Sequence, residues 1–120
     1  MKRQFRIGNE TLDFKMTNKT IFDIDEKFEN FSDVINGLMQ GRNLYNNTLK
    51  VMVCSCISRR VDEKNNEVYL TIDELIEKLE PAQIVSEIVP FATDLYLDYR
   101  GIKKSKTDEK KDNVEENKKK

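Results

Sequence analysis

Residues 44–57 read LYNNTLKVMVCSCI, and the rest of the chain is best understood by working outward from them. Between Val51 and Ile57, six of the seven side chains are apolar or behave as small hydrophobes. A helix with so little polar surface at one end belongs in the middle of a domain. The stretch therefore predicts a central core helix. Its expected apolar face consists of Tyr45, Leu49, Met52, Val53, Cys56 and Ile57.

Cys54 and Cys56 are the first candidates for chemistry in this stretch. Positions i and i+2 of a helix lie about 200° apart, so the two thiols would neither pair nor chelate one metal ion. The chain has no His to complete a zinc site. An apolar run also raises a thiol pKa, whereas a reactive thiol needs a lowered one. We interpret both cysteines as buried packing residues, and we expect no metal and no cofactor.

The 120 residues suffice for one modest domain. Of the 21 basic and 22 acidic residues, eight and five lie in residues 103–120, which leaves 13 and 17 for residues 1–102. We predict that 1–102 form the globular domain and that 103–120, with one aliphatic side chain, are disordered. An acidic body argues against binding nucleic-acid phosphates. With no apolar run long enough to span a membrane and no signal-peptide pattern, we expect a cytoplasmic protein.

An N-terminal β-hairpin is predicted by period-two alternation. Apolar residues alternate with polar ones before and after the turn residues 8–10, which gives the hairpin one apolar face that must pack on helices. That face consists of Phe5, Ile7, Leu12 and Phe14. A purely structural role and pairing of an open hairpin edge with a neighbouring subunit both remain possible interpretations.

The other segments have helical patterns. Residues 21–31 predict an amphipathic helix, after which Ser32 is expected to cap a short helix that Gly37 and Gly41 loosen at its end. Asn43 is a candidate cap of the central helix, and Arg59-Arg60 would oppose its C-terminal dipole. The charged residues 62–67 predict an exposed loop.

The C-terminal part of the domain has clear helix boundaries. Thr71 and Glu74 form the pattern of a reciprocal capping box, and Pro81 suits the first turn of the next helix. Pro90 should bend or split the last helix near residues 86–89, and Gly101 should end it. The fold class is therefore mainly α: a small helical domain with the hairpin packed on it and a charged, disordered C-terminal segment.

No catalytic set is recognisable. The chain lacks a His base and a Gly-rich phosphate loop, and the pairs Asp23/Asp25 and Asp73/Glu74 are explained by helix starts. We predict no enzymatic activity, which leaves binding or assembly, for instance by holding an amphipathic helix in a groove. Such binding needs half-exposed apolar side chains. The candidate partner-binding residues are Phe22, Leu38, Met39, Tyr45, Tyr96 and Leu97.

Three stretches give the chain a recognisable order after the hairpin. They are KMTNKTIFDIDEKF at 15–28, FSDVI at 31–35 and LTIDELI at 70–76. This order resembles the small tail-assembly chaperones of long-tailed phages and prophages of Gram-positive bacteria, over residues 3–102. The resemblance carries no catalytic or contact residues over to this chain. The charged loop at 62–67 departs from the family as an insertion.

The resemblance implies a chaperone that binds the phage tape-measure protein, keeps its apolar helices from aggregating in the host cytoplasm, and is absent from the mature virion. Such proteins often have a longer, frameshifted form, through which this chain would meet the major tail protein. The lysine runs at 103–104, 110–111 and 118–120 are candidate slippery sites. Homo-oligomers are also expected of such a protein. The alternative is a small phage regulatory or nucleic-acid-associated protein that uses its Lys-rich end on phosphates.

Overall fold

The chain begins with the expected hairpin. The structure is a computed structural model that describes residues 2–102. The predicted disorder of 103–120 concerns residues outside that range. Strands β1 (Arg3–Ile7) and β2 (Glu10–Phe14) pair antiparallel, with Phe5 opposite Leu12. Gly8 has φ 63°, which the first central residue of a two-residue hairpin turn requires.

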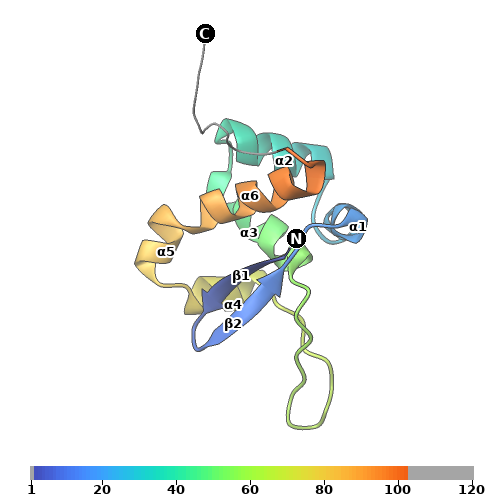
Figure 1. Cartoon of the computed structure of the whole chain (residues 1–120), viewed down its shortest axis with the longest axis vertical. Helices are drawn as coiled ribbons and strands as arrows, with labels where there is room; N and C mark the ends of the chain where they lie inside the picture. The colour runs from blue at the N-terminus through green and yellow to red at the C-terminus, as the bar shows by residue number, and fades with distance from the viewer. Residues whose placement is uncertain (1, 103–120) are drawn as a thin grey trace.

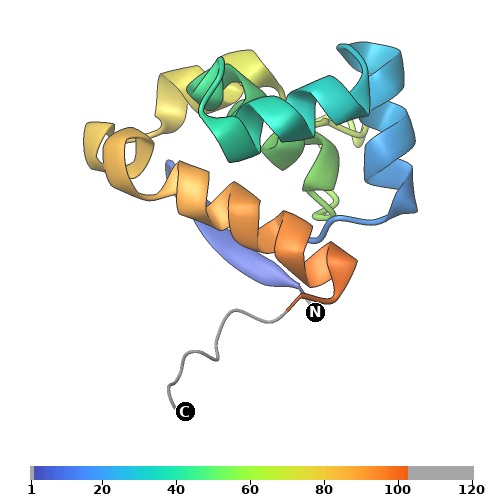
Figure 2. The ribbon, with the colours of Figure 1, turned by 90° about the horizontal axis from the view of Figure 1, so that it is seen from above.

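Helices make up most of the rest of the fold, and a long non-helical segment joins α3 to α4, so the prediction of a mainly α domain with an N-terminal hairpin is confirmed (Figure 1). Seen along a second direction, α6 runs between α2 and the hairpin (Figure 2). The helices are α1 (Asn18–Lys27), α2 (Phe31–Gln40), α3 (Leu44–Ser55), α4 (Ile72–Lys78), α5 (Pro81–Ser86) and α6 (Ile88–Arg100).

Helix α3 is the predicted core helix. It packs against α1, α2, α4 and α6, and Val51 and Met52 are completely buried. The helix ends at Ser55 because the chain then pairs with β2: Lys15 N donates to Ser55 O (2.8 Å), and Ile57 N donates to Asp13 O (2.9 Å).

Two members of the expected apolar face, Cys56 and Ile57, lie beyond α3, which ends at Ser55. Tyr45 is 46 % exposed at the first turn, where no neighbouring element covers it completely. Ile57 is 48 % exposed because it lies beyond the helix, in the extended segment that follows it. The core helix is therefore shorter than the apolar run that predicted it.

The apolar face of the hairpin is buried as predicted, and Phe91 of α6 covers it. The Phe91 ring lies 4.7 Å from the Phe5 ring and 5.3 Å from the Phe14 ring between centroids. Ion pairing fixes the same contact, because Arg3 Nε lies 2.6 Å from Asp98 Oδ2.

The hairpin edges are partly occupied. On β2, residues 55–57 pair beside Phe14 in an antiparallel bridge. On β1, the Arg6 carbonyl accepts from Gln83 Nε2 of α5 at 2.8 Å. These contacts favour the structural interpretation of the hairpin over strand pairing with a neighbour.

The junction between α1 and α2 differs from the prediction. Helix α2 begins at Phe31 with Asn30 as its N-cap, so Ser32 lies inside the first turn. The side chain of Asp25 explains the earlier start, since its Oδ1 accepts from Phe31 N at 2.7 Å. A residue of the preceding helix thus satisfies an amide that a cap residue would otherwise bind.

Gly37 has a packing role that the sequence pattern did not indicate, because neighbouring atoms approach it closely. A Cβ on Gly37 would lie 2.2 Å from Asn47 Nδ2 and 2.7 Å from the Arg42 carbonyl oxygen. Gly41 does end the helix, in a left-handed conformation. Asn43 is the N-cap residue of α3, although its side chain makes no capping hydrogen bond.

The C-terminal boundaries follow the sequence closely. Thr71 Oγ1 accepts from Glu74 N at 3.1 Å, Pro81 opens α5, and Gly101 ends α6 with φ 73°. The helical pattern splits at Glu87, three residues before Pro90, as predicted. One half of the capping box is absent: the Glu74 carboxylate binds Arg60 and not the Thr71 amide.

Candidate functional site

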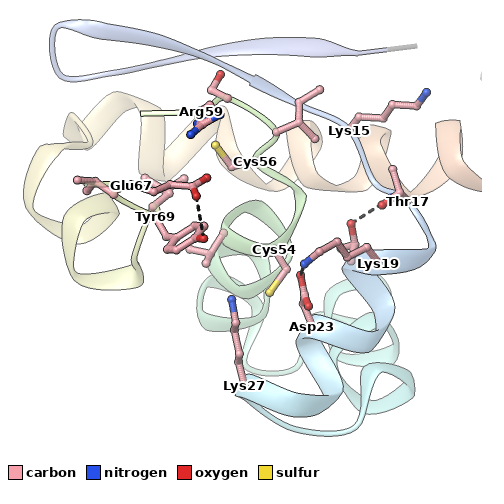
Figure 3. Close-up of a pocket in the computed structure, with 16 residues that line it drawn as sticks. Lys15, Thr17, Lys19, Asp23, Lys27, Cys54, Cys56, Arg59, Glu67 and Tyr69 are labelled. Atoms are coloured by element: carbon pink, nitrogen blue, oxygen red, sulfur yellow. Dashed lines mark hydrogen bonds and ion pairs between the residues drawn. The ribbon is translucent and has the colours of Figure 1, made fainter. Parts of the chain in front are cut away.

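A pocket of about 330 Å³ opens between α1, the end of α3 and the segment that leads to α4 (Figure 3). Helix α1 contributes Thr20, Asp23 and Lys27 to its wall, and the end of α3 contributes Val53 and Cys54. The opposite wall is formed by residues 67–70. These elements meet because α1 packs on α3 and the chain leaves α3 in an extended segment beside β2.

A second hollow of similar volume adjoins the first. The two share Lys27, Val53, Tyr69 and Leu70, and the second continues between Phe28 and residues 71–73. We call the continuous depression the α1–α3 groove. It lies beside α1, and its other wall is the segment 67–73.

Tyr69 is the most exposed aromatic side chain of the groove. It is 68 % exposed, and its hydroxyl donates to Glu67 at 3.1 Å. Lys27 Nζ lies 5.9 Å from the centre of its ring, within the range of a cation–π contact. Val68 and Ile57, which also line the groove, are exposed large apolar residues. The groove thus has an apolar wall that faces water.

The groove is rich in positive charge compared with the acidic body of the domain. Four cationic side chains line it against three carboxylates, those of Asp23, Glu67 and Asp73. Asp23 is paired with Lys19 at 2.7 Å, and this hydrogen bond raises the pKa of Lys19. The other three cationic side chains form no ion pair within residues 2–102. They are Lys15, Lys27 and Arg59.

Both thiols lie in the groove as free cysteines, half-buried and not fully buried as expected. Burial raises the pKa of Cys54 to about 11 and also raises that of Cys56. The predicted direction is therefore confirmed, although Cys56 lies just beyond α3. Within the described range, no group of three His, Cys, Asp or Glu side chains is placed to hold a metal ion.

The expectation that Leu38, one of the partner-binding candidates, is half-exposed was wrong. It is only 4 % exposed, because it shares the inner face of α2 with Val34 and Ile35 at helical spacing. The sequence pattern could not distinguish a residue on the buried face of α2 from a residue at the edge of that face.

The other five candidates keep exposed surface. Phe22 is 71 % exposed, Met39 and Tyr45 are nearly half exposed, and Tyr96 and Leu97 are half-buried. They lie on four different helices, and none lines the α1–α3 groove. Tyr96 packs at the edge of the core, with its ring 6.4 Å from that of Phe31.

Sequence reasoning missed Tyr69. Its position directly after a charged loop indicated a connection, and no helical or strand periodicity marks it. The run Val68-Tyr69-Leu70 was the available signal, since three apolar residues in succession without a regular element need a surface to rest on.

Comparisons of the chain with protein-family models, with curated proteins and with solved structures found no match. None of the helices in residues 2–102 has the length and apolarity that crossing a bilayer requires.

Proposed function

We propose that this protein is a non-catalytic phage tail-assembly chaperone that binds the tape-measure protein and keeps its apolar helices soluble. The order of the hairpin and of the stretches at 15–28, 31–35 and 70–76 supports this function by resemblance. The structural observation that carries it is the α1–α3 groove, an open depression with an apolar floor and an exposed aromatic wall.

The groove suits a helical client better than a chemical reaction. Exposed apolar surface with a polar rim is typical of sites that bind another chain, and an amphipathic helix places its apolar face in such a groove. Its thiols have raised pKa values, opposite to the shift that a nucleophile needs. Binding of apolar segments before assembly is therefore the activity that the site supports.

Co-expression tests this function directly. The tape-measure protein of the same phage or prophage would be expressed alone, with this protein, and with a Tyr69→Ser variant. We expect it to be insoluble alone, soluble with the wild-type protein and less soluble with the variant. A tape-measure protein that remains insoluble in all three cultures would contradict the proposal.

The proposed role places the protein in the host cytoplasm during assembly and not in the mature virion. A frameshifted longer form would connect it to the major tail protein. Reading the gene tests this part: the absence of a slippery heptamer with an overlapping downstream frame would exclude the longer form. Residues 103–120, where the lysine runs lie, are outside the described range.

The alternative function, nucleic-acid association through the Lys-rich end, makes a different prediction. Binding to DNA or RNA would weaken steeply with salt and disappear when residues 103–120 are deleted. Binding to an apolar helical client would survive both changes in large part.

A further inference from the structure

We propose that the α1–α3 groove selects acidic amphipathic helices: segments with one apolar face flanked by Asp or Glu. This inference rests on the proposed function only for the identity of the client protein. The groove's own apolar and charged residues specify the chemistry of the helix that it binds.

The floor accounts for the apolar half of the recognition. Val53 and Leu70 lie where the two hollows of the groove join, and Phe28 and Ile72 extend the apolar lining toward α4. Tyr69 forms a wall beside this floor, and its side chain is exposed to water in the free protein. A helix about 10–12 Å in diameter that laid its apolar face here would remove these side chains from water.

The rim accounts for the acidic half. Lys15, Lys27 and Arg59 are exposed and have no carboxylate partner among the described residues, so their charges are available to a ligand. Lys27 points into the groove from α1, whereas Arg59 lies at its other end, beyond Cys56 (Figure 3). Carboxylates placed along both sides of a bound helix would meet these cations, which steers and orients such a helix.

Two other macromolecular occupants fit less well. The chain's own residues 103–120 carry eight Lys against five acids, the same net sign as the groove. A nucleic acid would meet the same cations and the same carboxylates as an acidic helix. The apolar floor distinguishes the two ligands, because it gives a phosphate backbone nothing to bind.

A second copy of this chain is the remaining competitor. Helix α1 exposes Phe22 close to Asp25 and Glu26, a small acidic and apolar surface of its own. If that surface filled the groove of another copy, the protein would self-associate. Self-association is therefore measured in the same experiment.

The test uses the full chain and two labelled synthetic helical peptides of about 18 residues, which form a helix about 27 Å long. Both peptides have Leu at the same positions of one face; one has Glu and the other Lys at the flanking positions. We expect the Glu peptide to bind, by fluorescence anisotropy, at least tenfold more tightly than the Lys peptide. The difference should shrink with added salt.

Variants locate the binding. Lys27→Glu/Arg59→Glu should weaken binding of the Glu peptide at least tenfold, while the matched reversal of two exposed cations elsewhere, Arg42→Glu/Lys64→Glu, should leave it unchanged. Thermal unfolding checks that each variant is folded. Lys27→Gln/Arg59→Gln, which removes charge without reversing it, replaces any reversal that does not fold.

Several results would overturn the inference. The first two are equal affinity for the two peptides and equal effects of the two charge reversals. The third is binding of a single-stranded oligonucleotide that Lys27→Glu/Arg59→Glu abolishes. The fourth is self-association, measured by sedimentation, that the same variant abolishes. The proposed function fails separately. If wild-type protein and Lys27→Glu/Arg59→Glu solubilise the tape-measure protein equally, only this inference fails. If the Glu peptide binds as expected and the tape-measure protein stays insoluble, only the proposed function fails.

Discussion

Arg60 and Glu74 form a two-pronged ion pair, with Arg60 Nη1 2.8 Å from Glu74 Oε2 and Arg60 Nη2 2.9 Å from Glu74 Oε1. The pair ties the segment after α3 to the first turn of α4. Arg60 also binds Glu10 at the hairpin turn, and Glu74 also binds Lys78. One guanidinium therefore holds three parts of the fold together, at the base of the wall that Tyr69 belongs to.

This pair makes stability depend on pH. The hydrogen bonds from Arg60 lower the pKa of Glu74 from 4.5 to about 2, and its side chain is 15 % exposed. Because the folded-state pKa is lowered, the stabilisation is complete above the unfolded pKa and is lost as the pH falls from about 5 to 2. Solvent screening reduces the contribution of this ion pair to the free energy of unfolding to about 1–2 kcal/mol.

Comparison of wild type with Glu74→Gln isolates this contribution from the other carboxylates. We expect the variant to be about 1–2 kcal/mol less stable at pH 7 and nearly equal to wild type at pH 2, by urea unfolding. A difference that stays constant across this pH range would contradict the assignment.

Gly37→Ala should destabilise the protein, although alanine normally stabilises a helix by up to about 1 kcal/mol relative to glycine. The new Cβ would meet Asn47 Nδ2 and the Arg42 carbonyl, which are joined by a 2.9 Å hydrogen bond. We expect a loss of about 1–3 kcal/mol in the free energy of unfolding. Asn36→Ala, at the exposed neighbouring position, is the control and should have little effect. Stabilisation by Gly37→Ala would show that the contact is not tight.

Ser55→Ala should leave stability unchanged or raise it by about 1 kcal/mol. The Ser55 hydroxyl is completely buried at the end of α3 and has no hydrogen-bond partner among residues 2–102. Ser58→Ala is the matched control and should cost about 1 kcal/mol, because Ser58 Oγ accepts from Asp13 N at 2.7 Å. Chemical denaturation of both variants distinguishes the two hydroxyls. A larger loss for Ser55→Ala than for Ser58→Ala would contradict this view.

Cys54 should be slow to alkylate in the folded protein. With a pKa of about 11, its thiolate fraction at pH 8 is about 100-fold below that of a thiol at the ordinary value of 9.0. In a Cys56→Ser background, the rate with iodoacetamide should rise about tenfold per pH unit until the pH approaches 11. Unfolding in urea should restore fast reaction. A folded-state rate that levels off near pH 9 would show that Cys54 is not desolvated.

Local patterns predicted the elements of this fold well. Alternation around Gly8 specified the hairpin, Thr71 marked the start of α4, and Pro90 marked the split before α6. In each case the residues that determine the element lie within a few positions of it, so the local sequence is enough to predict the element.

The features that the sequence did not predict correctly depend on contacts between residues far apart in the chain. Glu74 was expected to cap its own helix, but Arg60 lies fourteen positions away and takes the carboxylate. Leu38 was expected at the edge of the core because the packing of α2 on α3 and α6 cannot be read from its own spacing. The groove was missed for the same reason, since its two walls, α1 and the segment around Tyr69, are joined only in the folded chain.

The contact between β1 and α6 has a consequence for biosynthesis. Arg3 and Phe5 emerge from the ribosome early, but Asp98 and Phe91, which bind and cover them, emerge more than 80 residues later. Until α6 appears, the nascent hairpin has an uncovered apolar face, and closing so long a loop is slow compared with forming local helices. The chain is thus vulnerable to aggregation through this hairpin face for most of its own translation.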